Sequence, residues 1–128
     1  MNKGEIAKKN FELGFNCAQA VVLAFKEEMG MDELTLKKLI IGFGGGFGRQ
    51  RLVCGAVCGM TMVLGYLKSD GEDKLAAYSI IQEACKRVKE KCGSIICSEL
   101  KDGVNVEKKH SCAEICQIAA EITEEFLK

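Results

Sequence analysis

The feature that most constrains the fold is the spacing of the apolar residues, which follows the helical period along nearly the whole chain. The clearest case is the C-terminal segment, with apolar side chains at Cys112, Ile115, Cys116, Ala119, Ile122 and Phe126. No segment shows strand-like alternation of useful length, and the 128 residues include no proline. The sequence therefore predicts an all-α fold, with residues 1–128 forming a single compact bundle of about five or six helices.

Residues 54–67 are apolar on all sides, which is typical of a buried central helix. Gly55 and Gly59 lie four residues apart on it and would let a neighbouring backbone approach closely. The other predicted helices each carry one apolar stripe: a short one ended by Gly14, then residues 18–29, 36–43 after a cap at Asp32, about 70–92, and 112–126. Loops are expected at residues 42–51, 69–71, 92–97 and 101–109.

Charge and hydropathy exclude two classes of partner. The 18 basic and 18 acidic residues are spread along the chain, and there is neither tryptophan nor an aromatic RNA-binding motif, so no nucleic-acid partner is expected. No apolar run approaches the length of a membrane span, and residues 1–12 are polar and rich in lysine. We therefore expect no signal peptide, no membrane partner and a location in the reducing cytoplasm.

The chain contains eight cysteines but no Cys-x-x-Cys pair. Cysteine at this density indicates a disulfide framework, a metal or iron–sulfur site, or thiols that perform redox chemistry. The first interpretation is the weakest, because a chain of this length buries a core without disulfides, and dense disulfides belong mainly to small secreted domains.

Two cysteines occupy the same local setting. Residues 16–19 (Asn-Cys-Ala-Gln) and 111–114 (Ser-Cys-Ala-Glu) both read as capping boxes, which place Cys17 and Cys112 at the first position of a helix. Unpaired amides and the positive end of the helix dipole favour a thiolate at this position. The alternative is that both thiols pack inward as small apolar groups.

Cys54 begins the central helix directly after a glycine run, Arg49 and Arg51, a neighbourhood that suits an anionic sulfur. Cys97 lies near the start of a short helix or turn. Cys92 lies on the other side of the turn at residues 93–94 and is the alternative to Cys97 as the third cysteine of the site. The remaining three cysteines fall within apolar stripes and are interpreted as core residues: Cys58, Cys85 and Cys116. Cys58 and Cys116 each follow another cysteine by four residues, a spacing at which two cysteines on a helix can also share a metal.

The glycine run at residues 42–48 matches neither a P-loop nor the G-x-G-x-x-G pattern, so no nucleotide is expected. Its backbone amides can close around sulfur atoms or a cluster without obstruction by side chains. The candidate residues for that contact are Gly44, Gly45, Gly46 and Gly55. The alternative is a flexible connection between helices. His110 is interpreted as a solvated histidine, and no haem is expected because the motif Cys-x-x-Cys-His is absent.

These motifs together resemble a known family. A cysteine in residues 16–20, a glycine run leading into Cys-Gly-Ala-Val-Cys-Gly at residues 54–59, and later cysteines at 97 and 112 resemble the C_GCAxxG_C_C family of redox-active proteins over nearly the whole chain. The resemblance implies that the four family cysteines are Cys17, Cys54, Cys97 and Cys112. The family is similar in part to split-Soret cytochromes, which carry haem and an iron–sulfur centre, and only the iron–sulfur half of that analogy fits this chain.

The leading hypothesis is a redox protein whose four cysteines converge on one end of the bundle and pass electrons to a partner protein by thiol–disulfide exchange. In the alternative, the same four cysteines bind an iron–sulfur cluster or another thiophilic metal. A third possibility is a helical interaction domain without redox chemistry. No acid–base constellation indicates an enzyme with a defined small-molecule substrate. A symmetric homodimer is expected, with the glycine run or the helices bearing Met29, Met60 and Met62 at its interface.

Overall fold

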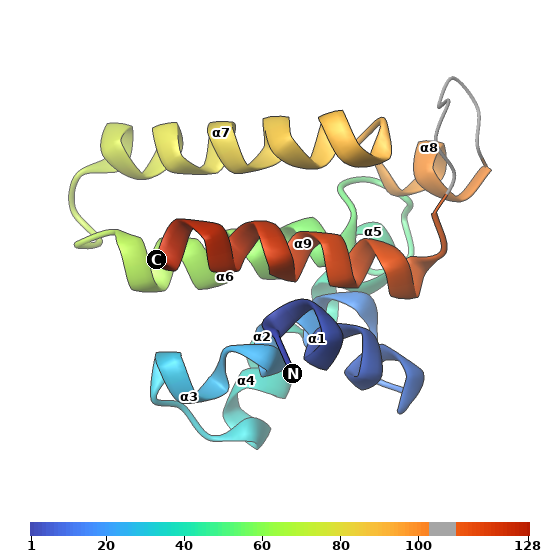
Figure 1. Ribbon diagram of the computed structural model, residues 1–128, viewed down its shortest axis with the longest axis horizontal. Coiled ribbons are helices and arrows are strands. Elements are labelled where there is room, and N and C mark those ends of the chain that lie inside the picture. The colour runs from blue at the N-terminus through green and yellow to red at the C-terminus, as the bar shows by residue number, and fades with distance from the viewer. Residues whose placement is uncertain (103–109) are drawn as a thin grey trace.

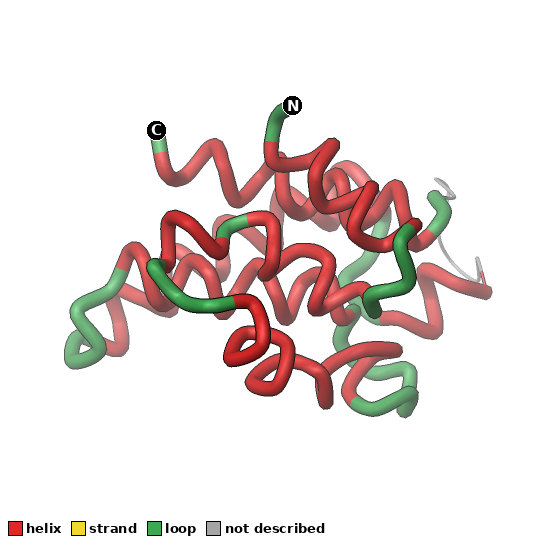
Figure 2. Tube along the Cα trace, turned by 90° about the horizontal axis from the view of Figure 1, so that it is seen from below, coloured by secondary structure: helices red, strands yellow, loops and turns green. Residues whose placement is uncertain are grey.

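The computed structural model describes residues 1–102 and 110–128, and this part of the chain is all-α apart from one isolated bridge (Figures 1 and 2). Six helices have eight or more residues, as the sequence predicts. In chain order the elements are α1 (Lys3–Glu12), α2 (Cys17–Ala24), α3 (Lys26–Met29), α4 (Glu33–Ile40), the 3₁₀ turn η1 (Ile41–Phe43), α5 (Gly44–Phe47), α6 (Gly55–Lys68), α7 (Lys74–Cys92), α8 (Cys97–Asp102) and α9 (Cys112–Leu127).

Helix α6 is the centre of the bundle. It packs against α2, α7 and α9, while α1 covers α2 and α9 on the other side. The side chains of Met60, Val63 and Leu64 are almost completely buried. A Cβ atom added to Gly59 would lie 2.8 Å from the carbonyl oxygen of Ala18 in α2. The close approach of a neighbouring backbone, predicted from the glycine spacing, is therefore confirmed, and α2 is the neighbour.

Three predicted helices have different boundaries in the structure. The helix expected over residues 18–29 breaks into α2 and α3 at Phe25, whose φ is −111° and whose ring is fully buried. The helix expected near residue 70 begins later, because the Asp70 carboxylate holds a turn by accepting from the backbone N–H groups of residues 72 and 73, so that Asp73 becomes the cap. The cap at Asp32 is confirmed, but α4 ends at Ile40.

The loops expected at residues 42–51 and 92–97 contain more order than predicted. The first includes η1 and the single turn α5, and the second pairs with residue 53 through an antiparallel bridge at Ile96. In the loop expected at 101–109, residues 101 and 102 belong to α8, and residues 103–109 lie outside the described part.

Within the described residues, no helix combines the length and the apolar character needed to cross a bilayer. Met29 and Met60 are buried inside the chain, so they offer no surface to a second copy, and Met62 is only partly buried. The homodimer stays a prediction.

Candidate functional site

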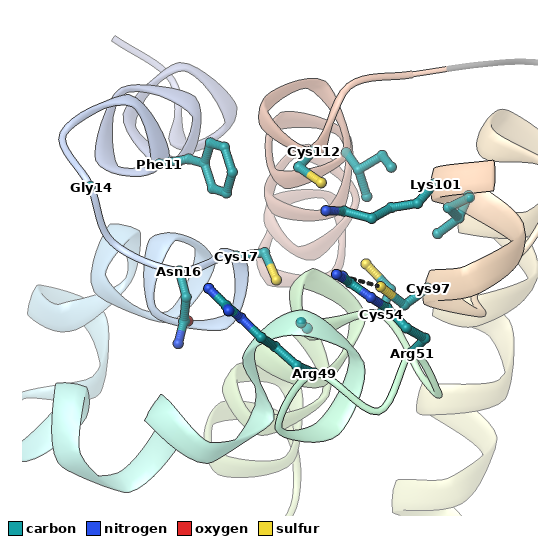
Figure 3. A pocket seen from close by; sticks show the side chains of 14 residues that line it. Phe11, Gly14, Asn16, Cys17, Arg49, Arg51, Cys54, Cys97, Lys101 and Cys112 are labelled. Atoms are coloured by element: carbon teal, nitrogen blue, oxygen red, sulfur yellow. Dashed lines mark hydrogen bonds between the residues drawn. The ribbon is translucent and has the colours of Figure 1, made fainter. Parts of the chain in front are cut away.

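The starts of α2, α6, α8 and α9 meet at one end of the bundle, where they surround a cavity of about 340 Å³ (Figures 1 and 3). All four cysteines selected from the sequence line this cavity: Cys17, Cys54, Cys97 and Cys112. These four cysteines are free thiols. The structure therefore brings together residues that lie up to 95 positions apart (112 − 17) in one thiol-lined space.

Both predicted capping boxes are present and fix the first and last of these cysteines. Asn16 Oδ1 accepts from the backbone N–H three residues later at 2.8 Å, and the Gln19 side chain accepts from the N–H of Asn16 at 3.1 Å. Ser111 Oγ accepts in the same way at 3.1 Å, with the reciprocal bond at 2.9 Å. Each box starts its helix at the following residue, so Cys17 and Cys112 take the first helical position.

The other two cysteines are placed by a short backbone pairing. Val53 and Ile96 form the isolated antiparallel bridge, and the N–H of Cys97 donates to the carbonyl of Leu52 at 2.6 Å. This pairing joins the segment before α6 to the segment before α8. Cys54 and Cys97 each follow the bridge by one residue, and each stands at the start of its helix. The bridge is thus the reason that these two thiols face the same cavity.

Glycines allow the backbone to lie directly against two of the cysteines. A Cβ atom on Gly55 would collide with Cys17 Sγ. A Cβ atom on Gly46, whose φ is +74°, would lie 2.6 Å from the Cβ of Cys97. Any larger residue at either position would displace the thiol beside it, because real Cβ atoms do not approach so closely.

The four glycines proposed as cofactor contacts have two different positions. Gly45 and Gly55 line the cavity, whereas Gly44 and Gly46 pack behind it, Gly44 against the side chain of Asn16. The structure therefore gives these glycines a close-packing role around the cysteines. Their contact with a cofactor stays a prediction.

Three cationic side chains enter the cavity: Arg49, Arg51 and Lys101 (Figure 3). Arg51 Nη1 donates to Cys97 Sγ at 3.8 Å. Among the described residues no carboxylate lines the cavity, and neither Arg49 nor Lys101 pairs with one. The cavity is therefore electropositive in a chain whose formal net charge is zero.

The backbone that carries the two arginines is strained. Phe47, Arg49 and Arg51 have φ values of 70°, 63° and 63°, in the left-handed region that side-chain-bearing residues rarely adopt. Each such residue costs on the order of 1–3 kcal/mol and persists only where its surroundings require it. Here the backbone N–H groups of Arg49 and Arg51 bond to the carbonyls of Gly44 and Gly45, which curls the segment tightly beside the thiols.

Burial dominates the ionisation of two cavity cysteines. It raises the pKa of Cys54 to about 12, and negative charge at Cys17 adds to the effect, while N–H groups in the first turn of α6 oppose it. Burial also raises the pKa of Cys112, against the lowering effect of Lys101. The expectation of a thiolate at Cys112, based on its helix start, is therefore wrong, and so is that of an anionic sulfur at Cys54, based on the nearby arginines and backbone amides. In both cases desolvation of the sulfur outweighs the groups that favour the thiolate.

The other four cysteines lie outside the cavity lining. Cys116 is buried directly behind it and donates from Sγ to the carbonyl of Cys17 at 3.7 Å. Cys58 and Cys85 are half-buried, and Cys92 is buried at the end of α7. Their positions agree with the interpretation of Cys58, Cys85 and Cys116 as packing residues, and Cys97 rather than Cys92 lines the cavity.

Sequence reasoning missed two contributors to this site. Lys101 follows Cys97 by four residues on α8, the spacing that puts two side chains on one helix face, so the signal was present in the sequence. Phe11 reaches the cavity from α1, which no local pattern connects to the cysteines. His110 is not part of the lining, and it lies 3.8 Å from a carboxylate oxygen of Glu114.

A single metal ion does not fit the arrangement of these side chains. Across residues 1–102 and 110–128, no group of three or more histidine, cysteine, aspartate or glutamate side chains is placed to hold one. The donor set facing the cavity is nevertheless purely thiol, which is the ligand chemistry of iron–sulfur clusters.

Comparisons with known proteins give one family. A family model described as "Putative redox-active protein (C_GCAxxG_C_C)" matches residues 15–126, a range that includes all four cavity cysteines. A protein of Archaeoglobus fulgidus described as uncharacterized is 30% identical in an alignment of 128 positions, gaps included, that covers 88% of this chain and 85% of that protein. No solved structure matches the chain.

Proposed function

Because the chain belongs to the C_GCAxxG_C_C family, we propose that it is a thiol redox protein whose cavity cysteines cycle between thiols and a disulfide. The observation that carries the proposal is the convergence of four free thiols from four helix starts on one cavity. Packing alone gives no reason for cysteines so distant in sequence to share a cavity that also holds three cations. A reducing cytoplasm would keep the resting thiols free.

Cys97 and Cys54 are the proposed reactive pair. The backbone bridge at Val53 and Ile96 holds them on adjacent segments, and negative charge at Cys97 raises the pKa of Cys54 after the larger effects of burial and Cys17. Arg51 donates to Cys97 Sγ, the cationic setting in which a cysteine acts as a nucleophile. We therefore assign the attack to Cys97 and the resolving step to Cys54.

The exchange is a two-electron transfer to an acceptor disulfide. The Cys97 thiolate attacks one acceptor sulfur, which breaks the acceptor S–S bond and releases one thiolate that takes up a proton. Cys54 then attacks Cys97 Sγ, and its proton passes to the second thiolate as that group leaves. The two protein thiols become one disulfide, and the acceptor disulfide becomes two thiols. The sequence led us to expect that a partner protein carries this acceptor.

The test is to map the disulfide that forms under mild oxidation. Reduced protein, purified without oxygen, is treated with diamide, a thiol-specific two-electron oxidant, alkylated and analysed by peptide mass spectrometry. We expect a link between Cys54 and Cys97, and its absence in Cys54→Ser and Cys97→Ser. Cys85→Ser is the matched control, because this thiol is half-buried outside the cavity, and it should keep the link. Unchanged free thiols in the oxidised wild type would remove the proposal.

The second candidate is an iron–sulfur protein, and the four cysteines that line one cavity are the observation that favours it. Cys17, Cys54, Cys97 and Cys112 would hold the cluster, which supplies one-electron transfer when bound. Protein purified without oxygen separates the two candidates. A brown colour with absorbance at about 400 nm and stoichiometric iron supports the iron–sulfur function. Colourless, iron-free protein that gains a disulfide supports the thiol function.

A further inference from the structure

The charge around the thiols is of one sign. Arg49, Arg51 and Lys101 line the cavity, and no carboxylate of the residues that the structure describes joins them, although the chain as a whole has as many acidic as basic residues. Figure 3 shows Arg51, from the segment before α6, and Lys101, from α8, reaching toward the space between the sulfur atoms, while Arg49 ends beside Asn16 near Cys17. Elsewhere Lys3, Lys26 and Arg87 each pair with a carboxylate, Lys3 with Glu28 at 2.7 Å. The positive charge of the cavity is therefore available to bind an anionic ligand.

The reactive thiols are recessed. Cys54 is 6% exposed and Cys97 is 7% exposed, so the surface of a folded protein does not reach them directly. The cavity of about 340 Å³ in front of them is within the size range of small-molecule sites. The space therefore fits a small molecule better than a protein loop.

Apolar side chains complete the lining and strengthen the effect of the cations. Phe11, Leu100 and Ile115 face the same cavity. Charge–charge attraction is stronger beside such groups than in open water, because the effective dielectric constant is lower. The two arginines also sit on backbone in the left-handed region, a conformation whose cost indicates that their placement matters.

We propose that the acceptor of this cavity is a small anionic disulfide, whose negative groups bind Arg49, Arg51 and Lys101 while its S–S bond meets Cys97. The inference rests on the proposed thiol function and names its substrate class. The electron and proton balance is unchanged: the small disulfide is cleaved to two thiols, and Cys97 and Cys54 become one disulfide. The cations act as binding residues that select the acceptor by charge.

The experiment compares three disulfides that differ mainly in charge. Reduced protein reacts with dithiodiglycolate (anionic), hydroxyethyl disulfide (neutral) and cystamine (cationic), and each rate constant is divided by that of free dithiothreitol to remove intrinsic reactivity. We expect the anionic probe to be favoured over the neutral one by roughly tenfold at low salt, with the cationic probe slowest. Salt should shrink the preference, because it screens exposed charges.

Two double variants with the same change of net charge decide whether the cations of the cavity cause the preference for the anionic probe. Arg49→Gln with Lys101→Gln should lower the anionic-to-neutral ratio by roughly tenfold. Lys38→Gln with Lys86→Gln, which removes two exposed lysines outside the cavity, should leave that ratio unchanged. All four positions are exposed, so these chains should fold, which circular dichroism checks.

The outcomes separate this inference from the thiol function. Two results would overturn the inference but not the thiol chemistry. One is the same normalised rate constant for all three probes, and the other is an anionic-to-neutral ratio that is the same in the cavity variant as in the wild type. Rapid reaction with the disulfides of insulin and none with the small probes would assign the acceptor to a protein instead. Failure to react with any disulfide, with all thiols still free, would overturn both.

Discussion

The cavity has two walls that begin from the same motif but are built differently. The first, here called the loop wall, consists of the start of α2, residues 44–55 and residues 95–97; the second, the α9 wall, is the start of α9. Asn16 in the loop wall also donates from Nδ2 to the carbonyl of Ile41 at 3.1 Å, and Gly44 packs against it. Ser111 in the α9 wall is exposed, and within the described part of the chain its side chain bonds only to the N–H of Glu114.

The difference shows that a capping box positions a cysteine along its helix, whereas long-range contacts decide how firmly that helix start is held in the site. The loop wall carries Cys17, Cys54 and Cys97 and depends on glycines with no room for a side chain. The α9 wall carries Cys112, which is half-buried. We expect perturbations of the loop wall to cost more stability than matched perturbations of the α9 wall.

The largest expected effect is a loss of stability at alkaline pH that depends on Cys54. Its pKa is raised from 9.0 to about 12 in the folded protein, so the folded thiol stays neutral while the unfolded thiol ionises. This contribution to stability is complete below pH 9 and is lost as the pH rises toward 12. At about 1.4 kcal/mol per pH unit, the free energy of unfolding falls by about 3 kcal/mol between pH 9 and 11 from this group alone.

Urea unfolding of wild type and Cys54→Ala at pH 8 and pH 11 measures that effect, because all other ionisations are common to both proteins. The stability gap between the two should change by about 3 kcal/mol over this range. Cys112→Ala should give a smaller change, since Cys112 is half-buried and Lys101 opposes the increase in its pKa. An equal or larger change for Cys112 would mean that the two walls do not differ in this way.

The next effect is steric and belongs to the loop wall alone. Gly55→Ala forces a methyl group against Cys17 Sγ and to within 2.9 Å of the backbone oxygen of Phe43, so we expect a loss of about 2–3 kcal/mol. Gly65→Ala is the matched control on α6, because a Cβ atom there meets nothing within 4 Å. It should stabilise the protein by about 0.5–1 kcal/mol through helix propensity.

Equilibrium unfolding in urea gives both values, and the alkylation rate of Cys17 shows whether the thiol has moved. If Gly55→Ala is tolerated as well as Gly65→Ala, the close contact between α2 and α6 is not what holds Cys17 in place.

Much of the fold and the choice of cysteines follow from local sequence patterns. The helical period, the two capping boxes and the Gly55–Gly59 spacing all concern residues a few positions apart, and the structure confirms each of them. The cysteines at helix starts were selected by the same local chemistry, supported by the family resemblance. A residue's own neighbours in sequence are sufficient to place it at a helix start.

The parts that were not predicted depend on contacts between distant segments. The break at Phe25 coincides with complete burial of its ring, and the bridge of Val53 to Ile96 joins segments 43 positions apart (96 − 53). The raised pKa of Cys54 has the same origin, because burial in the assembled bundle outweighs the local helix amides. None of these three features leaves a periodic signal in the sequence.

The smallest expected effect compares the two caps themselves. Ser111→Ala removes one exposed cap and should cost about 0.5–1 kcal/mol. Asn16→Ala removes a cap and the bond to Ile41, so it should cost about 1–2 kcal/mol. Asn16→Ser separates the contribution of the cap from that of the hydrogen bond to Ile41, because serine restores the cap but is too short to reach Ile41. If long-range contacts fix the loop wall, Asn16→Ser recovers only part of the loss in urea unfolding. Full recovery would show that the cap alone matters and that the two walls are equivalent at their helix starts.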